Sequence, residues 1–122
     1  MAFFASDLYR RMSSLPPEKV SRERKFMAAL SDLDISGEKI DVLRRSDAMI
    51  KGIIDLMFEE DEGITIVDYK SDVNISANAL KEKYTMQLML YKAAVEKITG
   101  KKVRECCLYS IALGKEIVIY KG

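Results

Sequence analysis

The chain has 122 residues, 48% of them hydrophobic and 32% charged, and a formal net charge of +1. These values are ordinary for one soluble globular domain, and they exclude a globally basic nucleic-acid binder. No apolar run is long enough to cross a bilayer, and the amino-terminal residues do not have the order of a signal peptide. The absence of histidine excludes a histidine base or metal ligand within the chain, and no GxxxxGK[ST] motif indicates a nucleotide-driven motor.

The first third of the chain predicts a helix and then a strand. Residues 2–14 favour a helix because apolar residues recur every three to four positions, and two prolines at 16–17 end it. The apolar positions are Phe4, Leu8, Met12 and Leu15. Residues 20–30 alternate loosely between apolar and polar, which favours a strand, and residues 31–39 predict a loop.

Two further strands and a tight turn are predicted next. The second strand spans residues 48–59 and could begin earlier, near Ile40. The stretch 60–63 is acidic and ends on glycine, which favours a hairpin turn. The third strand spans residues 64–70, so a hairpin here would pair it with the second.

A long helix and two last strands complete the predicted order. Ser76 or Asn78 would cap a helix that runs to about residue 99, where a glycine ends it. Strands at 103–113 and 116–120 follow, with a glycine in the turn between them. This order predicts an α/β domain in which one curved, mixed sheet is flanked by helices.

The two cysteines, Cys106 and Cys107, are adjacent in a predicted strand. Their side chains should point to opposite faces, so we expect both to be reduced rather than joined in a disulfide. Two cysteines are too few for a zinc site or an iron–sulfur cluster.

Charge is distributed unevenly along the sequence. Residues 55–68 contain six acids and no base, whereas residues 75–105 contain seven bases against three acids. A cation site beside a polyanion would need such an arrangement. Two ordinary solvated surfaces would look the same, and charge alone favours that simpler interpretation.

Two carboxylates and a lysine stand out. Alternation in the third strand places Asp68 and Lys70 on one face, at the end of an otherwise apolar run. A hairpin would bring Asp55, a lone charge among apolar residues of the second strand, close to them. Two carboxylates and a backbone carbonyl suit Mg²⁺, and a nearby lysine could orient or deprotonate a water for phosphodiester hydrolysis.

The alternative is a surface ion pair. A D-x-K triplet occurs by chance roughly 0.4 times in a chain of this length. Asp55 is harder to explain in that way, because a charge in apolar surroundings is costly without a partner or a metal.

The long helix carries a polar pair on its apolar stripe. Gln87 interrupts the stripe, and Tyr91 lies one turn later beside it. The stripe consists of Leu80, Tyr84, Gln87, Leu88, Tyr91, Val95 and Ile98. The pair could be a satisfied core hydrogen bond, which is favoured, or could reach over the metal site towards a substrate.

Taken together, these motifs resemble the RecB-family nuclease domain of the PD-(D/E)XK superfamily, in particular its AddA-type helicase–nuclease branch. The segments that carry the resemblance are FFASDLYRRM, VSRERKF, KGIIDLMFEEDEGITIVDYKSD and YTMQLMLYKAAVEKITGKKVRECCLYS. They cover most of the chain in the family's order. The combination of GIIDLMF, IVDYKSD and QLMLY is far more specific than any one of them.

The resemblance implies a restriction-endonuclease-like core and a role for each motif residue. Asp55 and Asp68 would be metal ligands, with the Tyr69 carbonyl as a third oxygen, and Lys70 would be the catalytic lysine. Three residues would support the active site or contact DNA: Gln87 and Tyr91, from the family's Q-x-x-x-Y motif, and Glu23, from a recurrent Arg–Glu pair. The cofactor would be Mg²⁺, with Mn²⁺ as an alternative.

One departure from the family concerns a metal-binding histidine. RecB-like nucleases usually carry it on a helix upstream of the first strand, and this chain has none. We therefore expect residues 1–122 to be one nuclease-core domain, the carboxy-terminal fragment of a longer helicase–nuclease. A short protein that has lost the histidine is the other explanation.

The leading hypothesis is thus a cytoplasmic, metal-dependent DNA exonuclease domain of recombinational double-strand break repair. Its partners would be single-stranded DNA, the helicase domain of the parent chain and a partner subunit, with no membrane. The alternative is a non-catalytic DNA-binding or scaffold module that keeps the fold. A nuclease of another branch, such as a phage exonuclease or a resolvase, fits the amino-terminal motif less well.

Overall fold

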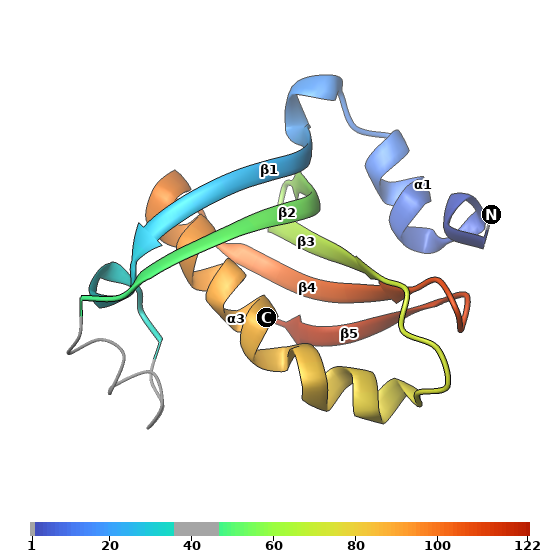
Figure 1. The fold of residues 1–122 in the computed structure, drawn as a ribbon. Helices are drawn as coiled ribbons and strands as arrows, with labels where there is room; N and C mark the ends of the chain where they lie inside the picture. The colour runs from blue at the N-terminus through green and yellow to red at the C-terminus, as the bar shows by residue number, and fades with distance from the viewer. Residues whose placement is uncertain (1, 36–46) are drawn as a thin grey trace.

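The computed structural model of the chain describes residues 2–35 and 47–122 (Figure 1). The possible early start of the second strand near Ile40, and residues 36–39 of the predicted loop, lie outside the described residues. Within the described ranges, no helix combines the length and the apolar character that a membrane span requires.

The helices and strands follow the predicted order. They are α1 (Asp7–Ser13), β1 (Val20–Ala29), β2 (Met49–Glu60), β3 (Gly63–Lys70), α3 (Ala77–Thr99), β4 (Val103–Ser110) and β5 (Lys115–Lys121). Short 3₁₀ turns cover Ala2–Ala5, Pro17–Lys19 and Leu30–Asp32. The five strands form one sheet in the order β1-β2-β3-β4-β5. β3 and β4 are parallel, and the other pairs are antiparallel, so the predicted mixed sheet is confirmed.

Local signals explain why α3 and the β2–β3 hairpin begin and end where they do. Ser76 caps α3, and its hydroxyl accepts a hydrogen bond from the Ala79 amide at 3.1 Å. Gly100 ends the helix with a left-handed φ of 69°. In the hairpin, Glu60 pairs with Gly63, so the predicted turn is confirmed.

The amino-terminal helix is shorter than predicted. Ser6 interrupts it: its hydroxyl accepts a hydrogen bond from the Tyr9 amide at 3.1 Å and caps α1. The buried aromatic residue before this cap is Phe3, whereas Phe4 is 60% exposed. The prediction of one helix over residues 2–14 with Phe4 on its buried face was therefore wrong.

The fourth strand also ends earlier than predicted. It stops at Ser110 rather than at Leu113, because the following residues form a turn. The Ser110 hydroxyl accepts a hydrogen bond from the Leu113 amide at 3.0 Å, and its carbonyl accepts one from Gly114 at 2.9 Å. These two bonds close the connection to β5.

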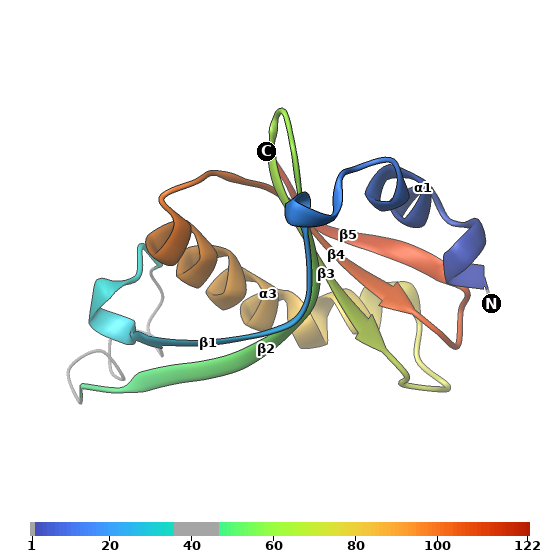
Figure 2. The same cartoon turned by 90° about the horizontal axis from the view of Figure 1, so that it is seen from above.

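Helices cover both faces of the sheet (Figures 1 and 2). α3 packs on one face, over a core that includes Ile66, Leu88 and Cys106. α1 packs on the other, over a core that includes Phe58 and Cys107. Both cysteines are free and lie in cores on opposite faces of the sheet, as predicted, and both are buried. Figure 2 also shows that β1 and β2 bend away from the other strands and arch over α3.

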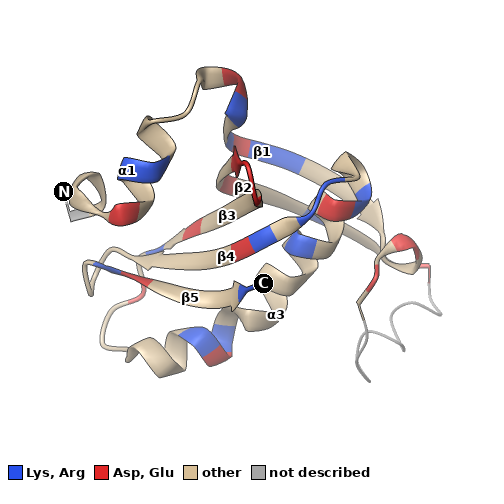
Figure 3. Ribbon diagram, turned by 180° about the vertical axis from the view of Figure 1, so that it is seen from behind, with Lys and Arg blue, Asp and Glu red and all other residues tan. Residues whose placement is uncertain are grey.

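A cluster of charges joins α1 to the sheet; Figure 3 shows how acidic and basic residues are distributed over these elements. Arg11 donates hydrogen bonds to the Glu60 carboxylate at 2.6 Å, to the Glu105 carboxylate at 2.9 Å and to the Thr65 hydroxyl at 3.3 Å. Its guanidinium also lies 5.5 Å from the centre of the Phe58 ring. Hydrogen bonding to Glu60 raises the pKa of Arg11, which keeps the cation charged.

Candidate active site

The site begins at a bend shared by β1 and β2. The register pairs Arg22 with Leu56 and Arg24 with Ile54, which leaves Glu23 opposite Asp55 between them. Glu23 has a left-handed φ of 49°, which is rare for a non-glycine residue. Ile54 packs in the α3-side core and Leu56 in the α1-side core, so the strand changes face at Asp55.

The same bend gives Asp55 a bonding partner. Pairing between β2 and β3 ends at Leu56 and Val67, because the preceding part of β2 diverges from β3 together with β1 (Figure 2). The Tyr69 amide instead donates a hydrogen bond to Oδ2 of Asp55 at 2.9 Å. The carboxylate thus replaces the missing ladder bond, and it is held beside the end of β3.

Asp68 is buried next to Asp55. Its side chain follows Ile64 and Ile66 on one face of β3, as predicted from the alternation, and the residue is only 4% exposed. Burial raises the pKa of Asp68 above the ordinary carboxyl range, and the neighbouring Asp55 carboxyl raises it further, whereas Lys70 acts in the opposite direction. The two carboxyls therefore lie close together in buried surroundings that disfavour the charged form of Asp68.

Lys70 lies between the carboxyl pair and α3. Its ammonium is 2.6 Å from Oδ2 of Asp68 and donates a hydrogen bond to Oε1 of Gln87 at 2.9 Å. Apart from this ammonium, no donor among residues 2–35 and 47–122 reaches the fully buried Oδ2 of Asp68.

The predicted pair on α3 lies beside this lysine. Nε2 of Gln87 donates to the Tyr91 hydroxyl at 3.2 Å. Tyr91 is 8% exposed, and its ring meets Phe26 edge-on with centroids 5.3 Å apart. A Cβ atom at Gly52 would lie 2.6 Å from the Phe26 ring and 3.0 Å from the Tyr91 ring, so glycine lets β2 pass close to both. The pair therefore joins the site to the bent strands.

Two predicted site residues are placed less centrally. Glu23 is exposed, and no hydrogen bond or ion pair joins it to another residue in the described parts of the chain. The Tyr69 side chain points to the α1 side, where its ring lies 5.1 Å from that of Phe3, so only the backbone of Tyr69 borders the carboxyl pair. A site here would draw on two carboxylates and main-chain oxygens, and no set of three or more Asp, Glu, Cys or His within the described ranges is arranged for a metal.

Two residues of this neighbourhood escaped the sequence analysis. The Tyr84 ring lies 3.9 Å from the Lys70 ammonium, and the Tyr84 hydroxyl lies 3.0 Å from both carboxylate oxygens of Asp72. Tyr84 was assigned to the apolar stripe of the helix, one turn before Gln87, and that position was the available signal. The position of Asp72, two residues after Lys70, was a weaker one.

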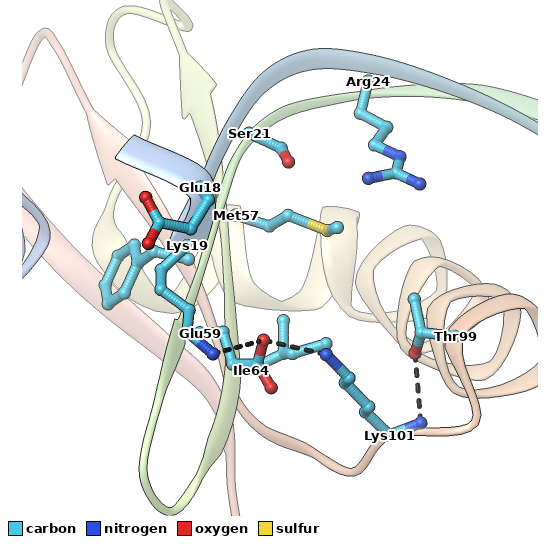
Figure 4. A pocket seen from close by; sticks show the side chains of 10 residues that line it. Glu18, Lys19, Ser21, Arg24, Met57, Glu59, Ile64, Thr99 and Lys101 are labelled. Atoms are coloured by element: carbon cyan, nitrogen blue, oxygen red, sulfur yellow. Dashed lines mark hydrogen bonds and ion pairs between the residues drawn. The ribbon is translucent and has the colours of Figure 1, made fainter. Parts of the chain in front are cut away.

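A small cavity of about 140 Å³ lies elsewhere, between the start of β1 and the end of α3 (Figure 4). It is lined by ten residues, none of which belongs to the predicted site. One carboxylate of its lining, Glu59, lies 3.5 Å from the Lys19 ammonium and 3.0 Å from that of Lys101, so this carboxylate is already paired. The carboxyl pair, where most of the predicted site residues gather, is therefore the candidate site.

Comparison with known proteins identifies the family of the chain. Residues 3–117 match the family model described as the PD-(D/E)XK nuclease superfamily. The chain is 37% identical over 121 residues to an ATP-dependent helicase/nuclease subunit of Clostridium botulinum (strain Alaska E43 / Type E3). It is 36% identical over 124 residues to the protein of the same name from Clostridioides difficile (strain 630).

These alignments cover 98% and 94% of the chain but only 10% of each relative. The chain thus spans about a tenth of the length of these curated relatives. The family model covers nearly all of it, and the fold and the motif order are those that the resemblance implied. This chain belongs to the PD-(D/E)XK nuclease superfamily.

Proposed function

We propose that the chain is the catalytic core of a divalent-metal-dependent deoxyribonuclease. The observation that carries the proposal is the pairing of two neighbouring carboxyls, Asp55 and buried Asp68, with a single ammonium 2.6 Å from Asp68. A purely structural ion pair needs one carboxylate for one ammonium. The second carboxylate makes the group acidic, which suits a hard cation with oxygen ligands.

The residues present fit Mg²⁺ or Mn²⁺. Asp55 and Asp68 would hold the ion, with the Tyr69 carbonyl as a third oxygen. The bound ion would supply Lewis acidity to the phosphate and lower the pKa of a coordinated water. Asp55 keeps its carboxylate at this position because the Tyr69 amide fixes one of its oxygens.

Lys70 is placed to act on the reacting groups. Gln87 accepts one of the three N–H donors of its ammonium and Asp68 lies against it at 2.6 Å, so one donor remains for an attacking water or a phosphate oxygen. A fixed ammonium of this kind would orient the water and stabilise the charge that develops on the phosphate. Tyr91 holds Gln87 from the other side, and Glu23, at the exposed edge of the bend, would border the DNA.

We further propose the context that the curated relatives' names suggest. The chain would digest single-stranded DNA as an exonuclease in recombinational repair of double-strand breaks, in the cytoplasm. The helicase domain of the same polypeptide would feed the strand, and a second subunit would complete the complex. The words "helicase" and "nuclease" in those names support this proposal.

End-labelled single- and double-stranded oligonucleotides test this function. Cleavage should require Mg²⁺ or Mn²⁺, stop with a chelator and release nucleotides progressively from one end. The Asp68→Asn variant should not cleave, while Asp61→Asn, at the exposed hairpin turn, should behave as the wild type. The assay should be carried out with the 122-residue chain and with any longer polypeptide that contains it.

The alternative is a module that binds DNA without cutting it. The absence of histidine from the chain favours it, because the family's usual histidine ligand would then be missing. DNA binding without cleavage in both forms of the protein would support this alternative and end the nuclease proposal.

A further inference from the structure

The Lys70 ammonium contacts a further side chain, Tyr84, besides the predicted residues Asp68 and Gln87. We propose that Tyr84 and Asp72 form a clamp that positions Lys70. The clamp deepens the proposed function: its effect on cleavage rests on that function, whereas its geometry does not.

The clamp consists of an aromatic face and a hydrogen-bonded anchor. The Lys70 ammonium lies 3.9 Å from the centre of the Tyr84 ring, within the range of a cation–π interaction. The Tyr84 hydroxyl donates to the Asp72 carboxylate, whose two oxygens are both 3.0 Å away. Lys83 pairs with the same carboxylate at 2.7 Å, so the anchor is itself fixed.

These contacts tie two separate elements together. Tyr84 belongs to α3, where it packs against the α3-side core, whereas Asp72 belongs to the loop that leaves β3 directly after Lys70. The ring thus spans the gap between the helix and the end of the strand. It limits the positions that the long, flexible Lys70 side chain could otherwise adopt.

The chemistry of an aromatic clamp suits a reacting lysine. A third carboxylate at this position would take up the charge and the N–H donors of the ammonium. The face of a ring attracts the cation while it accepts no conventional hydrogen bond, so the donors stay available for water or phosphate. Tyr84 is therefore a positioning residue, which acts through Lys70.

Two substitutions at Tyr84 separate the parts of the clamp. Tyr84→Phe keeps the aromatic face and loses the bond to Asp72, whereas Tyr84→Leu keeps apolar volume and loses the face. The matched control is Tyr120→Leu, because the Lys92 ammonium lies 4.9 Å from the Tyr120 ring in a similar contact away from the site.

Nuclear magnetic resonance of the 122-residue chain with ¹³C-labelled lysine measures the contact directly. The ε-methylene protons of Lys70, assigned with Lys70→Arg, should be shifted upfield by the ring current of Tyr84. The shift should persist in Tyr84→Phe and in Tyr120→Leu and should vanish in Tyr84→Leu. A folded wild type without the shift, or a shift that survives in Tyr84→Leu, would overturn the clamp.

Cleavage kinetics then measure its consequence. A cation–π contact of ordinary strength corresponds to roughly a tenfold change in rate, so kcat should fall about tenfold in Tyr84→Leu with KM nearly unchanged. Tyr84→Phe should recover most of this loss. An unchanged kcat in Tyr84→Leu would overturn the positioning role. A wild type that shows the ring-current shift and cuts no DNA would instead remove the proposed nuclease function and leave the clamp supported.

Discussion

Two charge clusters on opposite sides of the sheet have the same composition and different bonding. Each contains one cation and two carboxylates: Arg11 with Glu60 and Glu105, and Lys70 with Asp55 and Asp68. In the first, the guanidinium donates to both carboxylates and to a hydroxyl. In the second, the ammonium contacts the Asp68 carboxylate, whereas Asp55 accepts a hydrogen bond from the Tyr69 amide instead.

The difference in bonding separates a structural cluster from a reactive one. Hydrogen bonds satisfy the first cluster, so it can lock α1 onto the sheet without further ligands. The second cluster keeps two carboxyls close together in a buried space, which costs folding free energy in the absence of a cation. Charges that are retained at such a cost point to function.

The largest expected effect comes from removing the cation of the reactive cluster. Lys70→Ala should lower DNA cleavage by about 10² to 10⁴-fold, because general acid–base or electrostatic assistance of this kind contributes that much. The fold should survive, and ATP-driven unwinding by a longer polypeptide should be intact. Gel assays of cleavage measure this effect.

Asp68→Ala should give a similar cleavage defect by a different route, loss of the metal. The double variant should be no worse than either single variant, since residues that act as one unit are not additive. Near-normal cleavage by Lys70→Ala would reduce the lysine to a structural partner of Asp68 and remove the main chemical support for the nuclease.

Removing the cation of the structural cluster should lower the unfolding free energy and leave the cleavage reaction itself unaffected. Arg11→Ala leaves the Glu105 carboxylate, which is 6% exposed, without its charged partner, so we expect a loss of about 2–4 kcal/mol in unfolding free energy. Urea denaturation measures it. Arg10→Ala is the control, because Arg10 is 79% exposed and pairs only with Asp7 among the described residues. Equal losses of unfolding free energy in the two variants would show that the bonds from Arg11 to Glu60 and Glu105 add no stability beyond that of an exposed ion pair.

Removing one charge of the carboxyl pair should raise the unfolding free energy, by less than the loss expected for Arg11→Ala. The pKa of Asp68 is higher in the folded chain than in the unfolded chain. Its contribution to the unfolding free energy is therefore fully present at low pH and is lost as the pH rises through the folded-state pKa. Without metal, Asp68→Asn should therefore stabilise the chain by about 1–2 kcal/mol near pH 7.5. The gain should vanish below about pH 4, where the carboxyl is protonated in both states.

Urea denaturation in the presence of a chelator, at several pH values, checks the sign. Asp61→Asn serves as the control, because it removes an exposed carboxylate from the hairpin turn. A metal-free Asp68→Asn chain that is less stable than the wild type at pH 7.5 would mean that Lys70 fully compensates the buried charge.

The sequence predicts one half of the reactive cluster better than the other. Alternation in β3 places Asp68 and Lys70 on one face, because successive strand residues point to opposite faces. The same rule misses the change of face at Asp55, since the bend depends on the left-handed φ of Glu23 and residue type does not signal it. Spacing on α3 placed Gln87 beside Tyr91, where the structure confirms a hydrogen bond.

Contacts between distant elements account for what the sequence could not show. Arg10 and Arg11 are identical neighbours in the sequence, yet only Arg11 reaches the half-buried Glu60 of β2 and the buried Glu105 of β4. The break at Ser6 follows from a local capping bond that competes with an otherwise continuous helical pattern. The role of Tyr84 depends on where the loop after β3 brings Asp72.

The smallest expected effect is the stabilisation that Mg²⁺ gives to the isolated chain. The described residues offer two carboxylates and main-chain oxygens, with no histidine, and Mg²⁺ gives up its waters reluctantly. We therefore expect weak binding, with a Kd of roughly 1–5 mM. At about 10 mM Mg²⁺, mass action then adds only about 1 kcal/mol to the unfolding free energy.

Thermal denaturation with and without Mg²⁺, at matched ionic strength, measures this gain. Asp68→Asn should abolish it, because it removes a ligand charge, whereas Arg10→Ala should leave it unchanged. Titration calorimetry that revealed a tight, stoichiometric Mg²⁺ site would contradict the prediction. It would mean that the carboxyl pair and the main-chain oxygens beside it form a complete metal site without the family's histidine.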